Sequence, residues 1–301
     1  MIELDNIKAD TVIVIAGPTA SGKSALALDI ARRYNGEIVN ADSMQVYQGT
    51  PVLSAAPGAE EKREIPHHLY EIYHPSVNGT VVDWLERAAA VVRDIRSRGK
   101  LPVVAGGTGM YIDNLINGTT PIPEPLPEVR GQVRRLAAER GQEALYDLLQ
   151  KADPAGAARL NPNDATRVRR AYEIFLQTGI SIAEWYRRPM VKKLPEVEFW
   201  VIKIIPEAQE LDERCYRRFD LMMKAGALEE VRYLLSLDLD KNLPAMKMLG
   251  VPELAAFLNG AADLSEAVDS AKLHTRQYAK RQRTWFRNKL AAEIILERCF
   301  C

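Results

Sequence analysis

Hydrophobic and polar positions follow two regular patterns in the first part of the chain. Residues 11–16 form an uninterrupted β-branched and apolar run, typical of a strand buried on both faces of a parallel sheet. After a glycine-rich turn, apolar residues recur with helical spacing over 25–33, and Asn35-Gly36 marks the end of this predicted helix. Residues 37–40 then have the character of a second strand.

The same alternation continues further along the chain. Residues 84–98 predict a helix that Gly99 ends, and residues 101–105 predict a short strand before a second glycine-rich turn. Strands that alternate with helices favour an α/β fold whose parallel sheet has helices on both faces.

A proline-rich stretch interrupts this pattern. Residues 118–127 contain Pro121, Pro123, Pro125 and Pro127, which are incompatible with a regular helix or a central strand. Residues 128–188 are helical in pattern, with several breaks. Strand character returns at 199–205, and three helical blocks follow at 207–224, 228–237 and 264–290. The chain therefore predicts a core of residues 1–117 and 195–301, with an inserted all-helical domain at 118–194.

Composition narrows the class of protein. The 301 residues are 47% hydrophobic and 27% charged, which is typical of a globular protein. No run approaches the roughly 18 apolar residues of a membrane span, and the first residues lack the pattern of a secretion signal, so we expect a cytoplasmic protein. Three cysteines and four scattered histidines give no zinc-binding spacing. Forty basic residues balance forty acidic ones, so any polyanion partner must be recognised by local charge.

The first glycine-rich turn carries a phosphate-binding motif. Its sequence, Gly17-Pro18-Thr19-Ala20-Ser21-Gly22-Lys23-Ser24, matches G-x-x-x-x-G-K-[ST] and lies between a predicted strand and a predicted helix. Backbone N–H groups of such a loop surround phosphate oxygens, Lys23 adds a positive charge, and the Ser24 hydroxyl can ligate Mg²⁺. The chain therefore predicts a P-loop in the parallel-sheet core.

The second glycine-rich turn lacks the acid that nucleotide hydrolysis ordinarily needs. The strand at 101–105 runs into Gly106-Gly107-Thr108-Gly109, which offers backbone amides and a hydroxyl in place of a Mg²⁺-binding carboxylate. A motor or switch ATPase is therefore disfavoured. The nearest acid at a strand end is Asp42, which is a candidate general base or, alternatively, a helix cap or solvated loop acid.

The last predicted helix is strongly basic. Residues 270–292 contain no Asp or Glu, and five of their basic residues share one helical face. They are Lys272, Arg276, Lys280, Arg283 and Arg287. Because a solvated charged face ordinarily interleaves acids with bases, this pattern favours contact with nucleic acid. A second basic cluster at 167–170, together with the P-loop and Asp42, indicates group transfer from a phosphorylated donor to RNA or DNA.

Several of these motifs together resemble the tRNA dimethylallyltransferase (tRNA isopentenyltransferase) family, of the bacterial type without a zinc finger. The resemblance extends over nearly the whole chain. It rests on the P-loop, Asp42-Ser43-Met44-Gln45-Val46-Tyr47, Pro66-His67-His68-Leu69, Gly106-Gly107-Thr108-Gly109-Met110-Tyr111, Asn161-Pro162-Asn163-Asp164, and Thr275-Arg276-Gln277-Tyr278-Ala279-Lys280-Arg281-Gln282 with Thr284-Trp285-Phe286.

The resemblance implies a reaction and a set of roles. Residues 17–24 would hold the diphosphate of dimethylallyl diphosphate with Mg²⁺, and Asp42 would take the proton from N6 of the adenosine 3′-adjacent to the anticodon. Thr108 would position that amine, and Arg130 would help to bind the diphosphate. The partner would be the tRNA anticodon arm, and we expect a monomer. The tRNA contacts implied are Asp42, Ser43, Met44, Gln45, Thr166, Arg167, Val168, Arg169, Arg170, Thr275, Arg276, Gln277, Tyr278, Ala279, Lys280, Arg281 and Gln282.

The chain departs from the family pattern at two places, and other functions remain open. It has Leu249-Gly250-Val251-Pro252-Glu253 where Ile-Gly-Tyr-Lys-Glu is common, and Leu53-Ser54-Ala55-Ala56-Pro57 where Gly-Thr-x-Lys-Pro is usual. The alternatives are a small-molecule P-loop kinase, a prenyltransferase acting on free adenylate, and a non-catalytic RNA-binding module.

Overall fold

A parallel β-sheet forms the centre of the larger part of the molecule. The computed structural model describes residue 8 and residues 10–300. Within them the strands are β1 Thr11–Ala16, β2 Gly36–Asn40, β3 His67–His68, β4 Leu101–Gly106, β5 Glu198–Ile204 and β6 Ile294–Leu296. Their order is β3-β2-β4-β1-β5-β6, and every pairing is parallel. The short edge strands β3 and β6 were not predicted.

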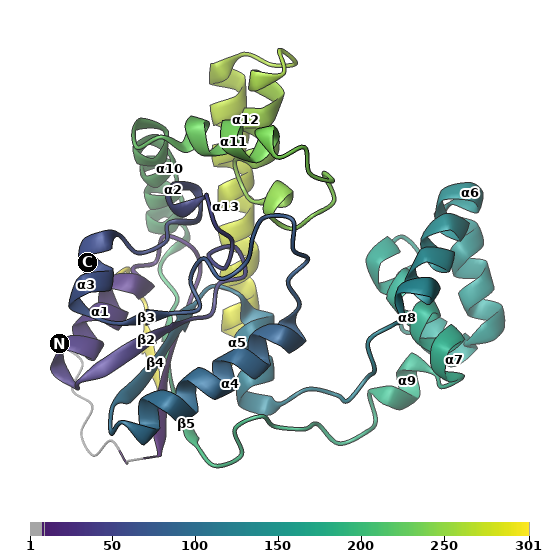
Figure 1. The fold of residues 1–301 in the computed structure, drawn as a ribbon, viewed down its shortest axis with the longest axis horizontal. Helices are drawn as coiled ribbons and strands as arrows, with labels where there is room; N and C mark the ends of the chain where they lie inside the picture. Colours follow the sequence, from purple (N-terminus) through teal and green to yellow (C-terminus); the bar gives the residue numbers. More distant parts are fainter. Residues whose placement is uncertain (1–7, 9, 301) are drawn as a thin grey trace. The chain divides into compact units, whose positions relative to one another are not determined.

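Helices connect these strands and also make up the inserted region (Figure 1). They are α1 Lys23–Arg33, α2 Pro51–Ser54, α3 Ala59–Glu64, α4 Val81–Ser97, α5 Gly109–Asn117, α6 Pro127–Ala152, α7 Pro154–Ala157, α8 Ala165–Thr178, α9 Ile182–Trp185, α10 Ala208–Lys224, α11 Ala227–Ser236, α12 Val251–Leu258 and α13 Leu264–Lys289, with a 3₁₀ turn at Ala245–Lys247. No helix in the described residues is both long and apolar enough to cross a bilayer.

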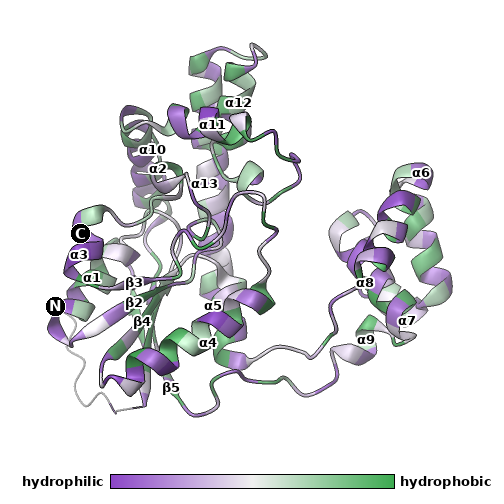
Figure 2. Cartoon of the chain, viewed as in Figure 1, coloured by the Kyte–Doolittle hydropathy of each residue, from purple (hydrophilic) through white to green (hydrophobic). Residues whose placement is uncertain are grey.

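The sheet has helices on both faces, as predicted. Successive side chains of a strand point to opposite faces, and β1 is buried throughout. Val12 and Val14 belong to a hydrophobic cluster that includes residues of α4 and α5, whereas Ile13 and Ile15 pack in a separate cluster with α1. In Figure 2, α4 carries both hydrophobic and hydrophilic residues, as a helix with one face on the sheet requires. The fold is therefore an α/β fold.

The chain divides into two compact units. One comprises the residues up to Ile116 and those from Lys193 onward, and the other, the helical unit, is Asn117–Lys192. All regular elements of the helical unit, α6 to α9, are helices, and they enclose their own hydrophobic cluster around Val133, Leu145 and Leu149. Gly141, at φ 81° and ψ 174°, breaks the regular conformation within α6.

Helix α12 was not predicted from the sequence. It begins at residues 249–253, one of the two departures from the family pattern. Gly250 precedes it at φ 91°, and Pro252 lies in its first turn, where the missing N–H costs no helical hydrogen bond. The Glu253 carboxylate accepts a hydrogen bond from the Gly250 N–H at 3.0 Å. The Val251-Pro252-Glu253 sequence is thus a helix start.

A buried carboxylate links the start of β2 to α4 and its following loop. Glu37 is 1% exposed and accepts hydrogen bonds from Arg98 and from Lys100, the latter at 2.7 Å. His68 of β3 contacts the same carboxylate at 2.7 Å. The hydrogen bond with Arg98 is the largest of the effects that hold the pKa of Glu37 well below its ordinary value of 4.5.

This cluster predicts a stability change that depends on pH. Glu37→Gln should lower the free energy of unfolding by about 2 kcal/mol at neutral pH, because two cationic partners lose a buried carboxylate while remaining partly hydrated. The folded-state pKa is depressed, so the contribution is present above the unfolded value and is lost as pH falls below it. Denaturant titration of parent and variant at several pH values measures this difference.

Glu64→Gln is the matched control. Glu64 also pairs with an arginine, Arg32, but both side chains are about half exposed. Its replacement should therefore leave the free energy of unfolding close to that of the parent. An equal loss for the two variants would contradict a special role for the buried cluster.

Candidate active site

The topology brings three loops to one edge of the sheet. Because β4 lies between β1 and β2 and all three are parallel, the segments after their carboxyl ends are neighbours. The Thr108 N–H donates to the Ala41 carbonyl at 3.2 Å. The Ser43 N–H donates to the Thr108 hydroxyl at 2.8 Å, and that hydroxyl donates to Ser43 Oγ at 3.1 Å. Thr108 therefore anchors the loop that carries Asp42.

The P-loop has a conformation that depends on glycine. Gly22 has φ 91°, and a Cβ built on it would lie 1.9 Å from the Phe300 carbonyl oxygen. The Phe300 N–H donates to the Ser21 carbonyl at 3.0 Å, so the end of the described chain packs on the loop. Helix α1 begins at Lys23, so the first N–H groups of the helix point toward the loop. A helix start of this kind favours a bound phosphate.

Lys23 is the first cation of the site. Its Nζ donates to the Pro18 carbonyl at 2.6 Å. Burial lowers the pKa of Lys23 to about 8, although the nearby Asp42 carboxylate opposes this shift. The Lys23 ammonium therefore lies within reach of any anion in the loop.

Two arginines from α10 complete the positive charge around the P-loop. Arg214 Nε donates to the Ala20 carbonyl at 2.9 Å, and Arg218 hydrogen-bonds the Thr19 hydroxyl. Burial lowers the pKa of Arg218. Neither residue belongs to a motif in the sequence, and only the packing of α10 brings them to a loop nearly 200 positions earlier. Sequence reasoning missed both for that reason.

Asp42 is held by its own loop. The buried Asn40 side chain accepts a hydrogen bond from the Asp42 N–H at 2.8 Å and donates to the Asp42 and Leu69 carbonyls, both at 3.0 Å. The Met44 N–H donates to Asp42 Oδ1 at 2.9 Å. The carboxylate is thus fixed at the end of β2.

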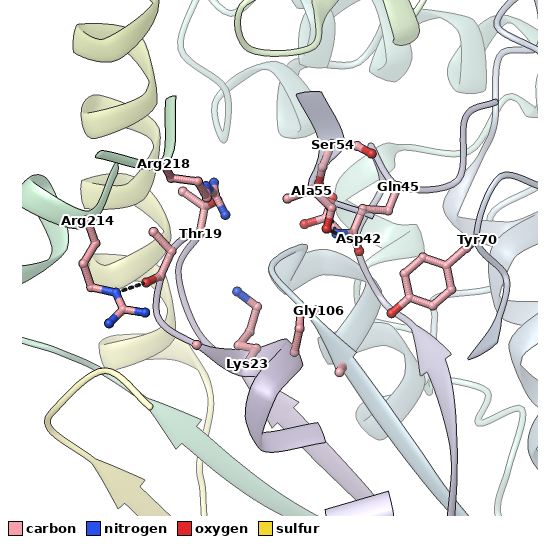
Figure 3. A pocket seen from close by; sticks show the side chains of 14 residues that line it. Thr19, Lys23, Asp42, Gln45, Ser54, Ala55, Tyr70, Gly106, Arg214 and Arg218 are labelled. Carbon is pink, nitrogen blue, oxygen red and sulfur yellow. Dashed lines mark hydrogen bonds between the residues drawn. The ribbon is translucent and has the colours of Figure 1, made fainter. Parts of the chain in front are cut away.

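A cavity of about 200 Å³ lies over the P-loop, and Figure 3 shows Lys23, Arg218 and Asp42 directed toward it. Its lining also includes Ser24, Gln45 and Tyr70. A second cavity of about 260 Å³ shares Thr19, Asp42, Ser54 and Arg218 with the first. Its other walls carry the apolar side chains of Leu53, Phe219, Met222, Met248 and Leu249, together with the cations Lys247 and Arg281. We call it the apolar cavity for its larger share of apolar side chains. The site therefore joins a cationic cavity to an apolar one, with Asp42 in the lining of both.

The departure at residues 53–57 contributes to this lining. Ser54 and Ala55 line the cationic cavity, and their carbonyls accept hydrogen bonds from Gln45 Nε2 at 3.0 and 2.8 Å. The segment therefore shapes the wall of the cavity with backbone groups where the family pattern carries a lysine.

Four of the expected tRNA contacts have buried side chains in this structure. Val168 is fully buried in the core of the helical unit, and Ala279 is fully buried against Leu211 and Cys215. Thr275 and Gln282 are 5% and 7% exposed. Their side chains lie on the packing faces of α8 and α13, so they offer little or no surface to a macromolecule.

The basic face of α13 also differs from expectation. Arg276 pairs with Asp212 at 2.8 Å and Lys272 pairs with Asp220 at 2.6 Å, both acids belonging to α10. Arg283 donates to the Pro206 carbonyl at 2.7 Å. Residues 270–289 of α13 contain no acid, and α10 supplies the carboxylates that pair with Lys272 and Arg276.

The exposed cations of α13 lie next to the site. Lys280 and Arg281 are both exposed, and the Arg281 guanidinium lies 5.8 Å from the centre of the Tyr278 ring. Arg281 and Tyr278 also line the apolar cavity. These residues therefore connect the basic surface to the interior of the site.

The helical unit carries the remaining expected residues. Arg130 and Arg170 both pair with Glu124, and Arg167 pairs with Asp164 at 2.7 Å. Thr166 and Arg167 are exposed. Their roles toward donor and tRNA stay predictions.

Comparison with known proteins gives a consistent result. The model of a family described as IPP transferase matches residues 45–289. The tRNA dimethylallyltransferase of Rhodospirillum centenum is 47% identical over 282 residues, covering 93% of this chain and 90% of the relative. That of Rickettsia massiliae is 41% identical over 290 residues, covering 96% and 80%. The chain belongs to the IPP transferase family.

Solved structures agree with this assignment. The full-length tRNA isopentenylpyrophosphate transferase of Bacillus halodurans is 34% identical, with a TM-score of 0.69 over 96% of this chain and 90% of that one. A eukaryotic dimethylallyltransferase studied while acting on tRNA is 30% identical, with a TM-score of 0.80 over 92% of this chain and 70% of that one. The family resemblance found in the sequence is thereby confirmed.

The ionisation of Lys23 predicts a pH dependence of anion binding. We expect the ratio of the diphosphate association constants of the parent and Lys23→Ala to be constant well below pH 8. Above that pH the ratio should fall by up to roughly tenfold per pH unit, because binding must then first protonate Lys23. Calorimetric titration with inorganic diphosphate measures both constants, and the ratio cancels the ionisation of the ligand itself. A ratio that does not change with pH would remove Lys23 from the anion site.

Proposed function

We propose that this protein transfers the dimethylallyl group of dimethylallyl diphosphate to N6 of the adenosine 3′-adjacent to the anticodon in tRNA, and releases diphosphate. The observation that carries the proposal is the pair of joined cavities. One is lined by phosphate-binding groups and the other by apolar side chains, and Asp42 is in the lining of both. The named relatives are tRNA dimethylallyltransferases, and this supports the choice of donor and acceptor.

The reaction needs a base for a weakly nucleophilic amine. As N6 attacks the first carbon of the donor, the bond from that carbon to the diphosphate oxygen breaks, and the N6 proton must leave. Asp42 is fixed by Asn40 and by the Met44 N–H, so its carboxylate is in place to accept this proton. The Thr108 hydroxyl accepts a hydrogen bond from the N–H of Ser43, the residue after Asp42. Thr108 is proposed to position the amine.

The leaving diphosphate needs neutralisation. The loop amides, Lys23 and Arg218 are proposed to stabilise its developing charge. The Ser24 hydroxyl in the first turn of α1 lines the same cavity as Asp42, a donor set that fits a Mg²⁺ ion bound mainly by phosphate oxygens and water. When bound there, Mg²⁺ would add positive charge at the leaving group. Arg130 is proposed as a further diphosphate ligand on the family resemblance.

The apolar cavity suits the hydrocarbon part of the donor. Phe219, Met222 and Met248 form much of its wall, and burial of a five-carbon chain against them is favourable by about 25 cal/mol per Å² of apolar surface. These side chains are proposed to limit the access of water to the reacting carbon, which would protect it from hydrolysis.

The nucleic acid is proposed to approach over the exposed part of α13. A hollow of about 270 Å³ beside Thr108 is lined by Met110, Tyr278, Arg281 and Trp285. Met110 is 57% exposed. An exposed thioether and two aromatic rings next to cations suit the stacking of unpaired bases, which a flipped-out adenosine requires. Thr166, Arg167, Arg169 and Arg170 are proposed as contacts from the helical unit.

The alternatives account for less of the structure. A small-molecule kinase leaves the apolar cavity and the exposed cations without a role, and an RNA-binding module leaves the P-loop without one. A prenyltransferase acting on free adenylate would not need Lys280 and Arg281. One assay separates these functions: purified protein with dimethylallyl diphosphate, ATP, tRNA and AMP, scored by mass for the modified acceptor. Cytoplasmic location and a monomeric state stay predictions of the sequence.

The base assignment gives the first prediction for activity. Asp42→Asn should lower kcat by about 10²- to 10⁴-fold, because the carbonyl oxygen of an amide cannot accept the N6 proton. Equilibrium binding of tRNA should change little, since Asn keeps the acceptor for the Met44 N–H. Single-turnover transfer and a filter-binding titration measure the two quantities. Turnover within threefold of the parent would exclude Asp42 as the base.

The exposed cations Lys280 and Arg281 of α13 give a second prediction, which concerns tRNA binding. Replacing Lys280 and Arg281 together with Gln should weaken tRNA binding and reduce the slope of log K against log salt by roughly 0.7 to 0.9 for each phosphate that is no longer neutralised. Lys272→Gln is the matched control, because it removes one charge from the same helix but from a cation already paired with Asp220. Equal slopes for the parent and the double variant would show that this surface does not bind tRNA.

A further inference from the structure

The buried Gln282 side chain joins the two glycine-rich loops of the site. Its Oε1 accepts a hydrogen bond from the Thr19 N–H at 2.8 Å, in the P-loop. Its Nε2 donates to the Gly107 carbonyl at 2.7 Å, in the turn that precedes Thr108. Gln282 is only 7% exposed. Both ends of one amide are therefore occupied by backbone groups of different loops.

The Gly107 turn also touches the proposed base. A Cβ built on Gly107 would lie 2.6 Å from Gln282 Nε2 and 3.2 Å from Asp42 Oδ2. Gly107 is thus packed between the amide and the carboxylate. Tyr278, one turn earlier on α13, lines the apolar cavity. A continuous chain of contacts runs from the P-loop through Gln282 and Gly107 to Asp42.

We propose that Gln282 is a positioning residue that sets the distance between the donor's diphosphate loop and the Asp42–Thr108 pair. This inference rests on the proposed function. It replaces the tRNA contact that the family resemblance implies for this residue. One loop would bind the leaving group, and the other would hold the amine and its base, so the distance between the two loops must be kept during the reaction. The pairing of β1 with β4 ends at Ala16 and Gly106, before the two loops, and so does not fix that distance. A planar amide with one donor and one acceptor of fixed separation supplies that spacing.

The test separates positioning from binding. Gln282→Met keeps the length of the side chain and removes both hydrogen bonds. We expect kcat to fall about 10- to 100-fold, because small displacements of reacting groups have effects of this size. The KM for tRNA and for the donor should stay within about threefold of the parent. An unchanged kcat would overturn the proposal, and so would a loss that appears wholly in the KM for tRNA, since that is the behaviour of a tRNA contact.

A double-mutant cycle tests the route through the turn. If Gln282 acts on the turn that carries Thr108, its replacement should cost much less kcat in a Thr108→Ala background than in the parent. Multiplicative effects of the two substitutions would overturn the proposal. Asn288→Met, an exposed polar position on the same helix, is the control for a change of side chain on α13 and should retain parental kcat.

A second variant keeps the test decisive if Gln282→Met fails to fold. Gly107→Ala leaves the amide in place but pushes a methyl group against both Gln282 Nε2 and Asp42 Oδ2. It should lower kcat with the same small changes in KM, and parental kcat would contradict the proposal. The parent's own transfer activity is measured first: absence of transfer contradicts the proposed function, whereas an active parent with an equally active Gln282→Met contradicts only this inference.

Discussion

The parallel pairing of β4 between β1 and β2 is the constraint on which the site depends. All three strands end at the same edge, so a phosphate-binding loop, an acid-bearing loop and a threonine-bearing turn are adjacent although they are far apart in sequence. The buried apolar strands stabilise this arrangement through both faces of the sheet. Polar groups at the strand ends are therefore placed by a hydrophobic core to which they contribute nothing.

The loops at this edge are held by side chains that pair with backbone groups. Asn40 satisfies the peptide groups around Asp42, Arg214 binds the Ala20 carbonyl, and Gln282 bridges Thr19 and Gly107. Peptide groups in a loop lack the backbone partners that helices and strands provide. Each of these side chains supplies such a partner to a loop peptide group. The site is thus preorganised by side-chain amides and a guanidinium, so less reorganisation is needed when charge develops in the reaction.

The sequence predicted the elements whose signal is local. The P-loop, β1 and α1 follow from a motif and from short-range hydrophobic patterns, and Asp42 follows from its place after β2. The sequence did not predict Arg218, since its place depends on how α10 packs. It also did not predict that Gln282 and Ala279 are buried, because a motif shows which residues recur together and not which face of the helix is buried. The two-residue β3 and the three-residue β6 are too short to have a distinct pattern.

The charged residues of α13 also show that packing between helices cannot be predicted from a local sequence pattern. From Ser270 onward α13 has basic but no acidic residues, yet α10 supplies Asp212 and Asp220 to Arg276 and Lys272. A paired cation loses its carboxylate when it binds a phosphate, so its net gain is smaller than that of an unpaired one. Lys280 and Arg281, for which we propose contact with RNA, lie one turn or less from Gln282. The proposed roles thus divide one helix between an exposed face that presents charge to the acceptor and a buried face that holds the P-loop through Gln282.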